Sequence, residues 1–202
     1  MTTFLLVRHA AHDWLGRGIA GRMGDVSLNA QGWLQAEALV GRLEGRPIHA
    51  IYSSPQPRTT QTVAAVAGRR RLKVNVMPAF DEIDFGEWTG REFASLEGDP
   101  QWGEWNEHRG SARVPGGEAF AEVQQRAVNA IEQLRVRHPE RTVLVVSHGD
   151  VIKAIVGTAL GMSLDLLERF EISPASVSVL EAGDGWVQLK QLNSQGLLAL
   201  HG

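Results

Sequence analysis

The most constraining feature of this 202-residue chain is an apolar run, Phe4–Val7, that ends abruptly in the polar pair Arg8 and His9. Consecutive apolar residues of this kind are typical of a strand buried on both faces of a parallel sheet. Ligands of α/β proteins bind at the sheet edge beyond the carboxyl ends of the strands. An arginine keeps its charge, and its planar fork suits an oxyanion. We therefore expect an anion site containing a histidine at the end of this strand.

Composition argues against several other classes of protein. The net charge is −3, with 20 Lys and Arg against 23 Asp and Glu, whereas nucleic-acid-binding proteins are usually basic. The chain has no cysteine, which excludes disulfides, thiol nucleophiles and cysteine-ligated metal sites. The N-terminus lacks a secretory signal pattern, and no apolar run approaches the ~20 residues needed to span a bilayer. We expect a cytoplasmic protein without a nucleic-acid or membrane partner.

The rest of the chain alternates between predicted strands and helices. Apolar periodicity, with Gly and Pro as breaks, predicts strands at 48–52, 72–77 and 142–147 and helices at 30–43, 57–67, 118–138 and 151–160. Ser27 or Asn29 is expected to cap the first helix. A hairpin is predicted over 176–191, around Gly183-Asp184-Gly185. This order predicts one domain over residues 1–202, a three-layer α/β/α sandwich with a mainly parallel central sheet.

One segment departs from this alternation. From about 79 to 117 the sequence is acidic, aromatic and broken by glycines, and we interpret it as a lid-like insertion. It contains Trp88, Trp102 and Trp105, three of the six tryptophans. These rings could form a wall for an aromatic or sugar-containing leaving group, or the apolar core of the lid itself.

Polar residues follow the predicted strands at points that we expect to converge. His148 ends the strand at 142–147 as His9 ends the first strand, Arg58 opens the helix after another strand, and Glu82 follows a further one. If the two histidine-ended strands are parallel and adjacent, both imidazoles meet at one sheet edge. Each residue alone also has a purely structural explanation, such as a solvated cation or a histidine bonded to backbone.

These residue types together suit phosphoryl transfer. Two arginines and helix N-terminal amides make a phosphate cradle, in which a neutral histidine can attack phosphorus. A second histidine can donate to the equatorial oxygens, and a carboxylic acid can protonate the leaving oxygen and then help water to attack. Two histidines and a carboxylate could instead bind a metal ion, but Arg8 and Arg58 would repel it. We therefore expect no metal.

Five blocks of sequence, in order, resemble the histidine phosphatase superfamily, also called phosphoglycerate mutase-like. The blocks are Leu6-Val7-Arg8-His9; Tyr52-Ser53-Ser54-Pro55 with Arg58 and Gln61-Thr62; Glu82-Ile83-Asp84-Phe85-Gly86-Glu87-Trp88; Pro115-Gly116-Gly117-Glu118; and Ser147-His148-Gly149.

The resemblance covers nearly the whole chain and implies a three-layer α/β/α fold, a phosphohistidine intermediate and neither metal nor cofactor. It implies that His9 is the nucleophile and Glu82 the proton donor, and that Arg8, Arg58 and His148 form the phosphate pocket. The predicted catalytic residues are His9, Glu82 and His148, and the predicted substrate-binding residues are Arg8, Arg58 and Gly149.

The first block departs from the pattern of the family it resembles. Ala10-Ala11-His12 stands where the family usually has Gly-Glu-Thr, and Leu15 stands where it commonly has an asparagine that contacts phosphate. His12, Arg17 and Arg22 are candidates to contact phosphate in its place. We expect weaker phosphate affinity rather than loss of the chemistry.

The function expected is metal-independent hydrolysis of a small phosphorylated metabolite. The segment at 79–117 is shorter than the lid usual in cofactor-dependent mutases, which favours transfer of the phosphoryl group to water. Phosphoglycerate mutase-type transfer and a non-catalytic phospho-ligand binding module are the alternatives. The sequence is compatible with a homodimer and does not decide the oligomeric state.

Overall fold

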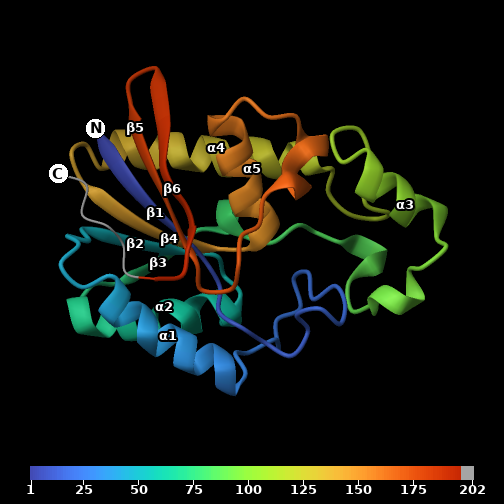
Figure 1. Cartoon of the computed structure of the whole chain (residues 1–202), viewed down its shortest axis with the longest axis horizontal. Helices are drawn as coiled ribbons and strands as arrows, with labels where there is room; N and C mark the ends of the chain where they lie inside the picture. The colour runs from blue at the N-terminus through green and yellow to red at the C-terminus, as the bar shows by residue number, and fades with distance from the viewer. Residues whose placement is uncertain (197–202) are drawn as a thin grey trace.

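The computed structural model describes residues 1–196, in which six strands form one sheet with the order β3-β2-β4-β1-β5-β6 (Figure 1). Strands β1 to β4 run parallel, and β5 and β6 extend the sheet as an antiparallel hairpin. The strands are β1 Thr2–Arg8, β2 Ala50–Ser53, β3 Val74–Val76, β4 Thr142–Ser147, β5 Val177–Gly183 and β6 Trp186–Ser194.

Helices cover both faces of the sheet. Figure 1 shows α1 and α2 on one side and α4 and α5 on the other, with α3 set apart at one end. The α-helices are α1 Ala30–Arg42, α2 Pro57–Arg70, α3 Pro100–Glu107, α4 Phe120–Arg137 and α5 Gly149–Ala159. Short 3₁₀ helices are η1 Pro78–Phe80, η2 Gly86–Trp88, η3 Phe93–Ser95 and η4 Leu164–Arg169. The three-layer fold predicted from the sequence is confirmed.

The middle of strand β1, Phe4–Val7, is apolar because it lies inside the sheet with a core on each face. Phe4 and Leu6 belong to the cluster that includes the buried residues of α4 and α5. Leu5 and Val7 point the other way, into the cluster with the buried residues of α1 and α2. Successive side chains of a strand alternate between faces, so a strand covered on both sides needs an apolar residue at every position.

Most predicted elements are confirmed, and the differences have local causes. Asn29 caps α1 by accepting a hydrogen bond from the Gly32 N–H at 2.9 Å. Helix α2 runs to Arg70, beyond the predicted end, and stops where Arg71 takes a left-handed conformation (φ 54°). The strand predicted at 72–77 shortens to β3, an edge strand that pairs only with β2.

The sequence did not fully predict two elements near the C-terminal end of the described chain. Strand β6 continues beyond the predicted Gln191 to Ser194, and η4 was not predicted. The tail after Gly196, for which the sequence predicted no pattern, lies outside the described residues. Within residues 1–196, no helix is long and apolar enough to cross a membrane.

The segment at 79–117 is irregular, as predicted, and has an apolar core of its own. Trp88 and Trp105 are buried, and their rings meet edge to face with centroids 6.2 Å apart. Trp105 also contacts Phe120 at the start of α4, at 5.9 Å between centroids. The segment is attached to the rest of the fold by this aromatic packing and by backbone hydrogen bonds to the loop after β1, such as that from the Ile19 N–H to the Arg91 carbonyl at 2.9 Å. It does not join the six-stranded sheet.

Truncating the central strand should destabilise the whole domain. Leu6 is 1% exposed in β1, so Leu6→Ala should lower the free energy of unfolding by about 2–5 kcal/mol because it leaves a cavity. Leu34 in α1 is 73% exposed, and Leu34→Ala should change that energy by about 0.5 kcal/mol or less. Urea unfolding of both variants measures the difference. Equal losses would contradict the assignment of β1 to the core.

Candidate active site

Pairing of β1 with β4 brings the two predicted histidines together. The strands are parallel, with Arg8 opposite Ser147, so His9 and His148 each follow the end of a neighbouring strand. The backbone N–H of His9 donates to the Ser147 carbonyl at 2.9 Å. The centroids of the His9 and His148 imidazoles lie 5.3 Å apart. The sequence-based expectation that both imidazoles meet at one sheet edge is confirmed.

His9 is held in a single tautomer. Its Nδ1 lies 2.9 Å from the carbonyl oxygen of Ala10, and because a carbonyl can only accept, Nδ1 carries the hydrogen. The lone pair is then on Nε2. Burial, followed by the charges of Arg58 and Arg8, holds the pKa of His9 well below its usual value. His9 is therefore a neutral imidazole with a nucleophilic nitrogen at physiological pH.

Arg58, which is buried, and Arg8, which is partly buried, line the same cavity as His9 and have unused hydrogen-bond donors. Arg58 is 1% exposed, and its Nη2 donates to the Gly21 carbonyl at 2.6 Å. Arg8 Nη1 donates to the Ile172 carbonyl at 2.6 Å. Among the described residues, Arg8 Nε and Arg58 Nε and Nη1 have no partner. Buried donors without acceptors are costly, so this pair of cations suits an anion with several oxygens.

His148 is connected to an acidic residue that the sequence did not single out. The Arg58 guanidinium has no acceptor, so it donates to His148 Nδ1 at 3.2 Å, and His148 Nε2 carries the hydrogen. His148 Nε2 donates to Ser54 Oγ at 2.8 Å, and the Ser54 hydroxyl donates to Asp81 Oδ1 at 3.1 Å. Asp81 is adjacent to Glu82 in an acidic stretch, and nothing in the sequence distinguishes their roles.

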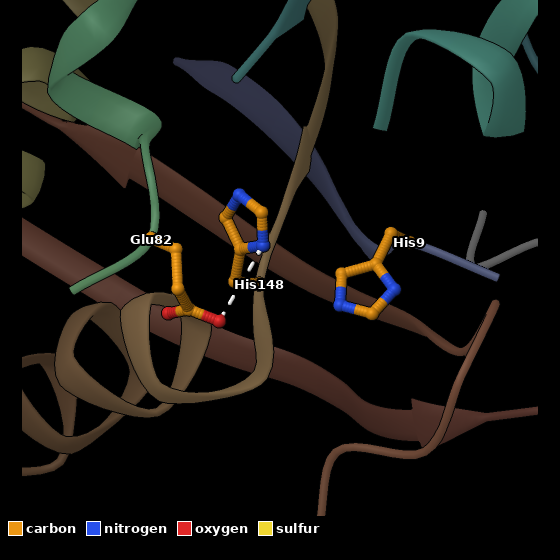
Figure 2. A group of neighbouring side chains, drawn as sticks. All are labelled: His9, Glu82 and His148. Carbon is orange, nitrogen blue, oxygen red and sulfur yellow. Dashed lines mark ion pairs between the residues drawn. The ribbon is translucent and has the colours of Figure 1, made fainter. Parts of the chain in front are cut away.

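Glu82 lies on the other side of His148, with Oε2 3.5 Å from His148 Nδ1 (Figure 2). Burial and, to a lesser degree, the neighbouring Asp150 carboxylate raise the pKa of Glu82 to about 7, against the opposing effect of Arg58. A carboxyl group with this pKa exchanges a proton near neutral pH, as a general acid and base must do.

His9, Glu82 and His148 could also hold a metal ion, because one ligand atom from each lies within 4.8 Å of the others. The charges of Arg8 and Arg58 act on all three groups. Two buried guanidinium groups beside such a site disfavour a cation and favour an anion. The donor set therefore fits an oxyanion better than a metal.

A cavity of about 330 Å³ opens above these groups. Trp102 and Trp105 of the segment at 79–117 form part of its wall, whereas Trp88 is not among the lining residues and packs edge to face on Trp102 at 5.2 Å. Trp88 is therefore core, while Trp105 is both core and wall. Asp150 and Arg109, which the sequence did not single out, also line the cavity and are paired at 3.2 Å.

The unusual residues of the first block lie in different places. Ala10 is buried in a small apolar cluster with Leu28, Ala36 and Ala175 rather than in the cavity lining. Its N–H donates to Thr62 Oγ1 at 2.8 Å. The methyl group that replaces glycine at this position therefore has space away from the cavity.

Of the three residues expected to contact phosphate in place of an asparagine, only one lies at the cavity. Arg17 is exposed and paired with Glu92 at 2.7 Å, and Arg22 is paired with Glu118 at 2.8 Å. His12 is buried and lines the cavity together with Leu15.

Gly149 does not line the main cavity and lies instead in the wall of a neighbouring cavity, together with Arg8 and Glu82. A Cβ at this position would come 3.4 Å from Arg8 Cζ, which is an ordinary contact distance. Its predicted contact with substrate stays a prediction.

A family model described as the histidine phosphatase superfamily (branch 1) matches residues 4–195. The chain belongs to this superfamily. It is 34% identical over 182 residues to phosphoserine phosphatase 1 of Hydrogenobacter thermophilus, covering 89% of this chain and 86% of that protein. It is 30% identical over 218 residues to a metal-independent phosphoserine phosphatase of Arabidopsis thaliana, covering 98% of this chain and 86% of that protein.

Solved structures of the superfamily share the fold. Bacillus stearothermophilus YhfR aligns with a TM-score of 0.90 at 29% identity, covering 96% of this chain and 99% of that one.

The chain spans only 55% of the length of three mycobacterial relatives that are 34% identical to it. The family and fold predicted from the five blocks are confirmed, and the chain is a phosphomonoesterase of the histidine phosphatase type.

The environment of Glu82 predicts a specific dependence on pH and leaving group. Since the pKa of Glu82 is raised to about 7, its protonated form is lost as the pH rises through that value. Turnover of an alkyl phosphate, whose leaving oxygen needs a proton, should fall relative to p-nitrophenyl phosphate above about pH 7. The phosphate groups of the two esters titrate at different pH values. The part of the pH dependence of the kcat/KM ratio that belongs to Glu82 is therefore the part that Glu82→Gln removes.

Glu82→Gln should slow the alkyl ester roughly 10²- to 10⁴-fold, affect p-nitrophenyl phosphate far less and flatten the pH dependence of the ratio. The matched control is Glu87→Gln, since Glu87 is exposed and lies outside the cavity lining. Equal slowing of both esters by Glu82→Gln would show that Glu82 is not the acid.

Proposed function

We propose that this chain hydrolyses small phosphomonoesters in two steps through a phosphohistidine on His9, without a metal ion. The observation that carries the proposal is the neutral His9, whose Nε2 lone pair lies beside the unpartnered donors of Arg8 and Arg58. A neutral nucleophile flanked by two fixed cations suits attack on an anionic phosphoryl group, since the cations offset its charge.

In the first step, His9 Nε2 attacks phosphorus and the bond from phosphorus to the ester oxygen breaks. Glu82 gives its proton to the departing oxygen, so that an alcohol leaves and Glu82 becomes a carboxylate. The imidazole gains positive charge as the N–P bond forms. The Ala10 carbonyl, which accepts from Nδ1 at 2.9 Å, stabilises this charge and keeps the ring oriented.

His148 is suited to respond to the charge of the bound phosphoryl group. A phosphate dianion near Nδ1 favours the protonated imidazole, and the Ser54–Asp81 connection on Nε2 supports the resulting positive charge. On protonation, Nδ1 gives up the hydrogen bond that it accepts from Arg58 and donates instead to an equatorial oxygen of the transferring group, which the freed Arg58 N–H can also contact. This role makes Ser54 and Asp81 positioning residues for His148.

In the second step, the Glu82 carboxylate takes a proton from water, and the oxygen of that water attacks phosphorus. The N–P bond breaks, inorganic phosphate leaves and His9 returns to its neutral state. Glu82 is then protonated again and ready for the next ester. A pKa of about 7 suits both directions of this proton transfer.

The segment at 79–117 is proposed to act as the lid of a single domain covering residues 1–202. It contributes an aromatic wall, Trp102 and Trp105, beside the paired Arg109 and Asp150. A wall of this mixed character suits a small leaving group with both apolar and charged atoms. Phosphoserine, named in several relatives, is one such ester. The cytoplasmic location and the absence of nucleic-acid and membrane partners stay predictions.

Replacing the nucleophile should abolish hydrolysis. His9→Ala should lower kcat for p-nitrophenyl phosphate roughly a thousandfold or more, because the cradle then holds no nucleophile comparable to the imidazole. Rapid quenching of the unmodified protein with ³²P-labelled ester should trap an acid-labile phosphoprotein that His9→Ala does not form. The exposed His108 serves as the control, and His108→Ala should retain full turnover.

The same assay tests the metal-independent mechanism. Turnover should be unchanged after dialysis against EDTA, since Arg8 and Arg58 rather than a cation hold the phosphoryl group. Loss of activity on chelation, recovered with a divalent metal, would instead assign His9, Glu82 and His148 to a metal site. Full activity in His9→Ala would exclude the covalent route.

Hydrolysis should outrun mutase chemistry. With 3-phosphoglycerate as substrate and 2,3-bisphosphoglycerate present, phosphate release should exceed formation of 2-phosphoglycerate. The two products are measured in one reaction by ³¹P NMR. Isomerisation faster than phosphate release would make the chain a mutase, and binding without either product would make it a phospho-ligand binding module.

A further inference from the structure

We propose that His12 is a second substrate-binding imidazole, which donates a hydrogen bond from Nε2 to the phosphoryl group and so supplies the contact that Leu15 cannot make. The inference rests on the proposed function, because it adds a residue to the same phosphoryl pocket. It concerns a position where the chain departs from its family, so the family pattern does not assign this role.

The loop after β1 holds the His12 ring in one tautomer. The backbone N–H of Trp14 donates to His12 Nδ1 at 3.2 Å. Nδ1 is therefore the acceptor, and the hydrogen of the neutral ring is on Nε2. The Leu15 N–H donates to the His12 carbonyl at 3.2 Å, which closes the same turn. The first of these hydrogen bonds orients the ring without using its Nε2–H, and the second fixes the turn that carries it.

The ring lies beside the nucleophile. Its centroid is 4.9 Å from that of His9, closer than the 5.3 Å between His9 and His148. His12 is only 5% exposed, and the surface that remains lines the cavity above the cradle. Within residues 1–196, no protein group accepts a hydrogen bond from its Nε2. An N–H donor on a largely buried ring next to the nucleophile, in the wall of the cavity, suits an oxygen of the substrate.

The surrounding charges make His12 a neutral donor. Burial, Arg58 and Arg8 lower the pKa of His12 to about 4, and Asp13 opposes them only weakly. The neighbouring His9 and His148 are also neutral. Because the charges of Arg58 and Arg8 both lower the pKa of His12, its ring lies close enough to these two residues to contact the same anion. It can therefore donate to the phosphoryl group without adding a third cation to the pocket.

Leu15 explains why this hydrogen bond is needed. It lines the same cavity from the same loop, three residues later, and its side chain has no polar atom. Arg17 and Arg22, the other two candidates for this contact, are paired with Glu92 and Glu118. Position 12 thus presents to the cavity the polar group that position 15 does not have.

The test uses two substitutions that separate the donor from the fold of the loop. His12→Asn keeps an acceptor for the Trp14 N–H but has no donor at the place of Nε2. His12→Gln places an amide N–H at the same number of bonds from the backbone as Nε2. His108→Asn is the matched control on an exposed histidine. The measurements are the Kd of inorganic phosphate by calorimetry, kcat and KM for p-nitrophenyl phosphate, and the urea unfolding midpoint.

His12→Asn should weaken phosphate binding roughly 10- to 100-fold, as expected for removal of one hydrogen bond to a charged acceptor. His12→Gln should recover most of the affinity, and His108→Asn should match the unmodified protein. Leu15→Asn alone should change the Kd little, whereas in the His12→Asn background it should restore binding. The ratio of Kd values between His12→Asn and the unmodified protein should stay constant from pH 6 to pH 8, because the donor is neutral.

Several outcomes would overturn the inference. An unchanged Kd in His12→Asn would show that His12 does not contact phosphate, and failure of both His12→Gln and Leu15→Asn to restore binding would reduce His12 to a structural role. A lower unfolding midpoint that accounts for the weaker binding would lead to the same conclusion. If the unmodified protein neither binds phosphate nor hydrolyses p-nitrophenyl phosphate, the proposed function fails. If it does both and His12→Asn behaves like it, only the role of His12 fails.

Discussion

The active site depends on the parallel pairing of β1 with β4. Their register sets Arg8 opposite Ser147, so the residues that follow, His9 and His148, leave the sheet at one edge. The pairing is maintained by two apolar cores, because the side chains of both strands are buried alternately against helices on opposite faces. Hydrophobic burial, acting on residues with no chemical role, therefore determines the distance between the two imidazoles.

The second constraint is electrostatic. Buried donor atoms of Arg8 and Arg58 have no partner among the described residues, an arrangement that costs stability unless an anion is bound. Burial, and after it the charges of Arg58 and Arg8, lowers the pKa values of the neighbouring imidazoles and keeps them neutral. The cations that suit an oxyanion thus also help to keep the lone pair of His9 free. Glu82 shows the opposite balance, because burial and Asp150 outweigh the arginines and raise its pKa to about 7.

The unusual first block shows how a site tolerates substitution. Ala10 places its methyl group in a separate apolar cluster, so the cavity is unaffected by it. Leu15 lines the cavity without a polar atom, and the nearby His12 presents a donor to the same space. Arg109 of the segment at 79–117 pairs with Asp150, the residue whose charge helps to raise the pKa of Glu82.

The sequence alone determined the α/β alternation, the apolar central strands and five ordered blocks that named the family and the residues at the strand ends. These follow from local patterns, since burial on both faces leaves a continuous apolar run and a strand end leaves an abrupt polar residue. Only the tertiary structure revealed the Ser54–Asp81 connection to His148, the pairing of Arg109 with Asp150, and the side on which Ala10 and His12 lie. These features join residues 27 to 94 positions apart, or depend on the direction of a side chain in an irregular loop. No local periodicity encodes such contacts, because they form only when the sheet and its two helical layers have assembled.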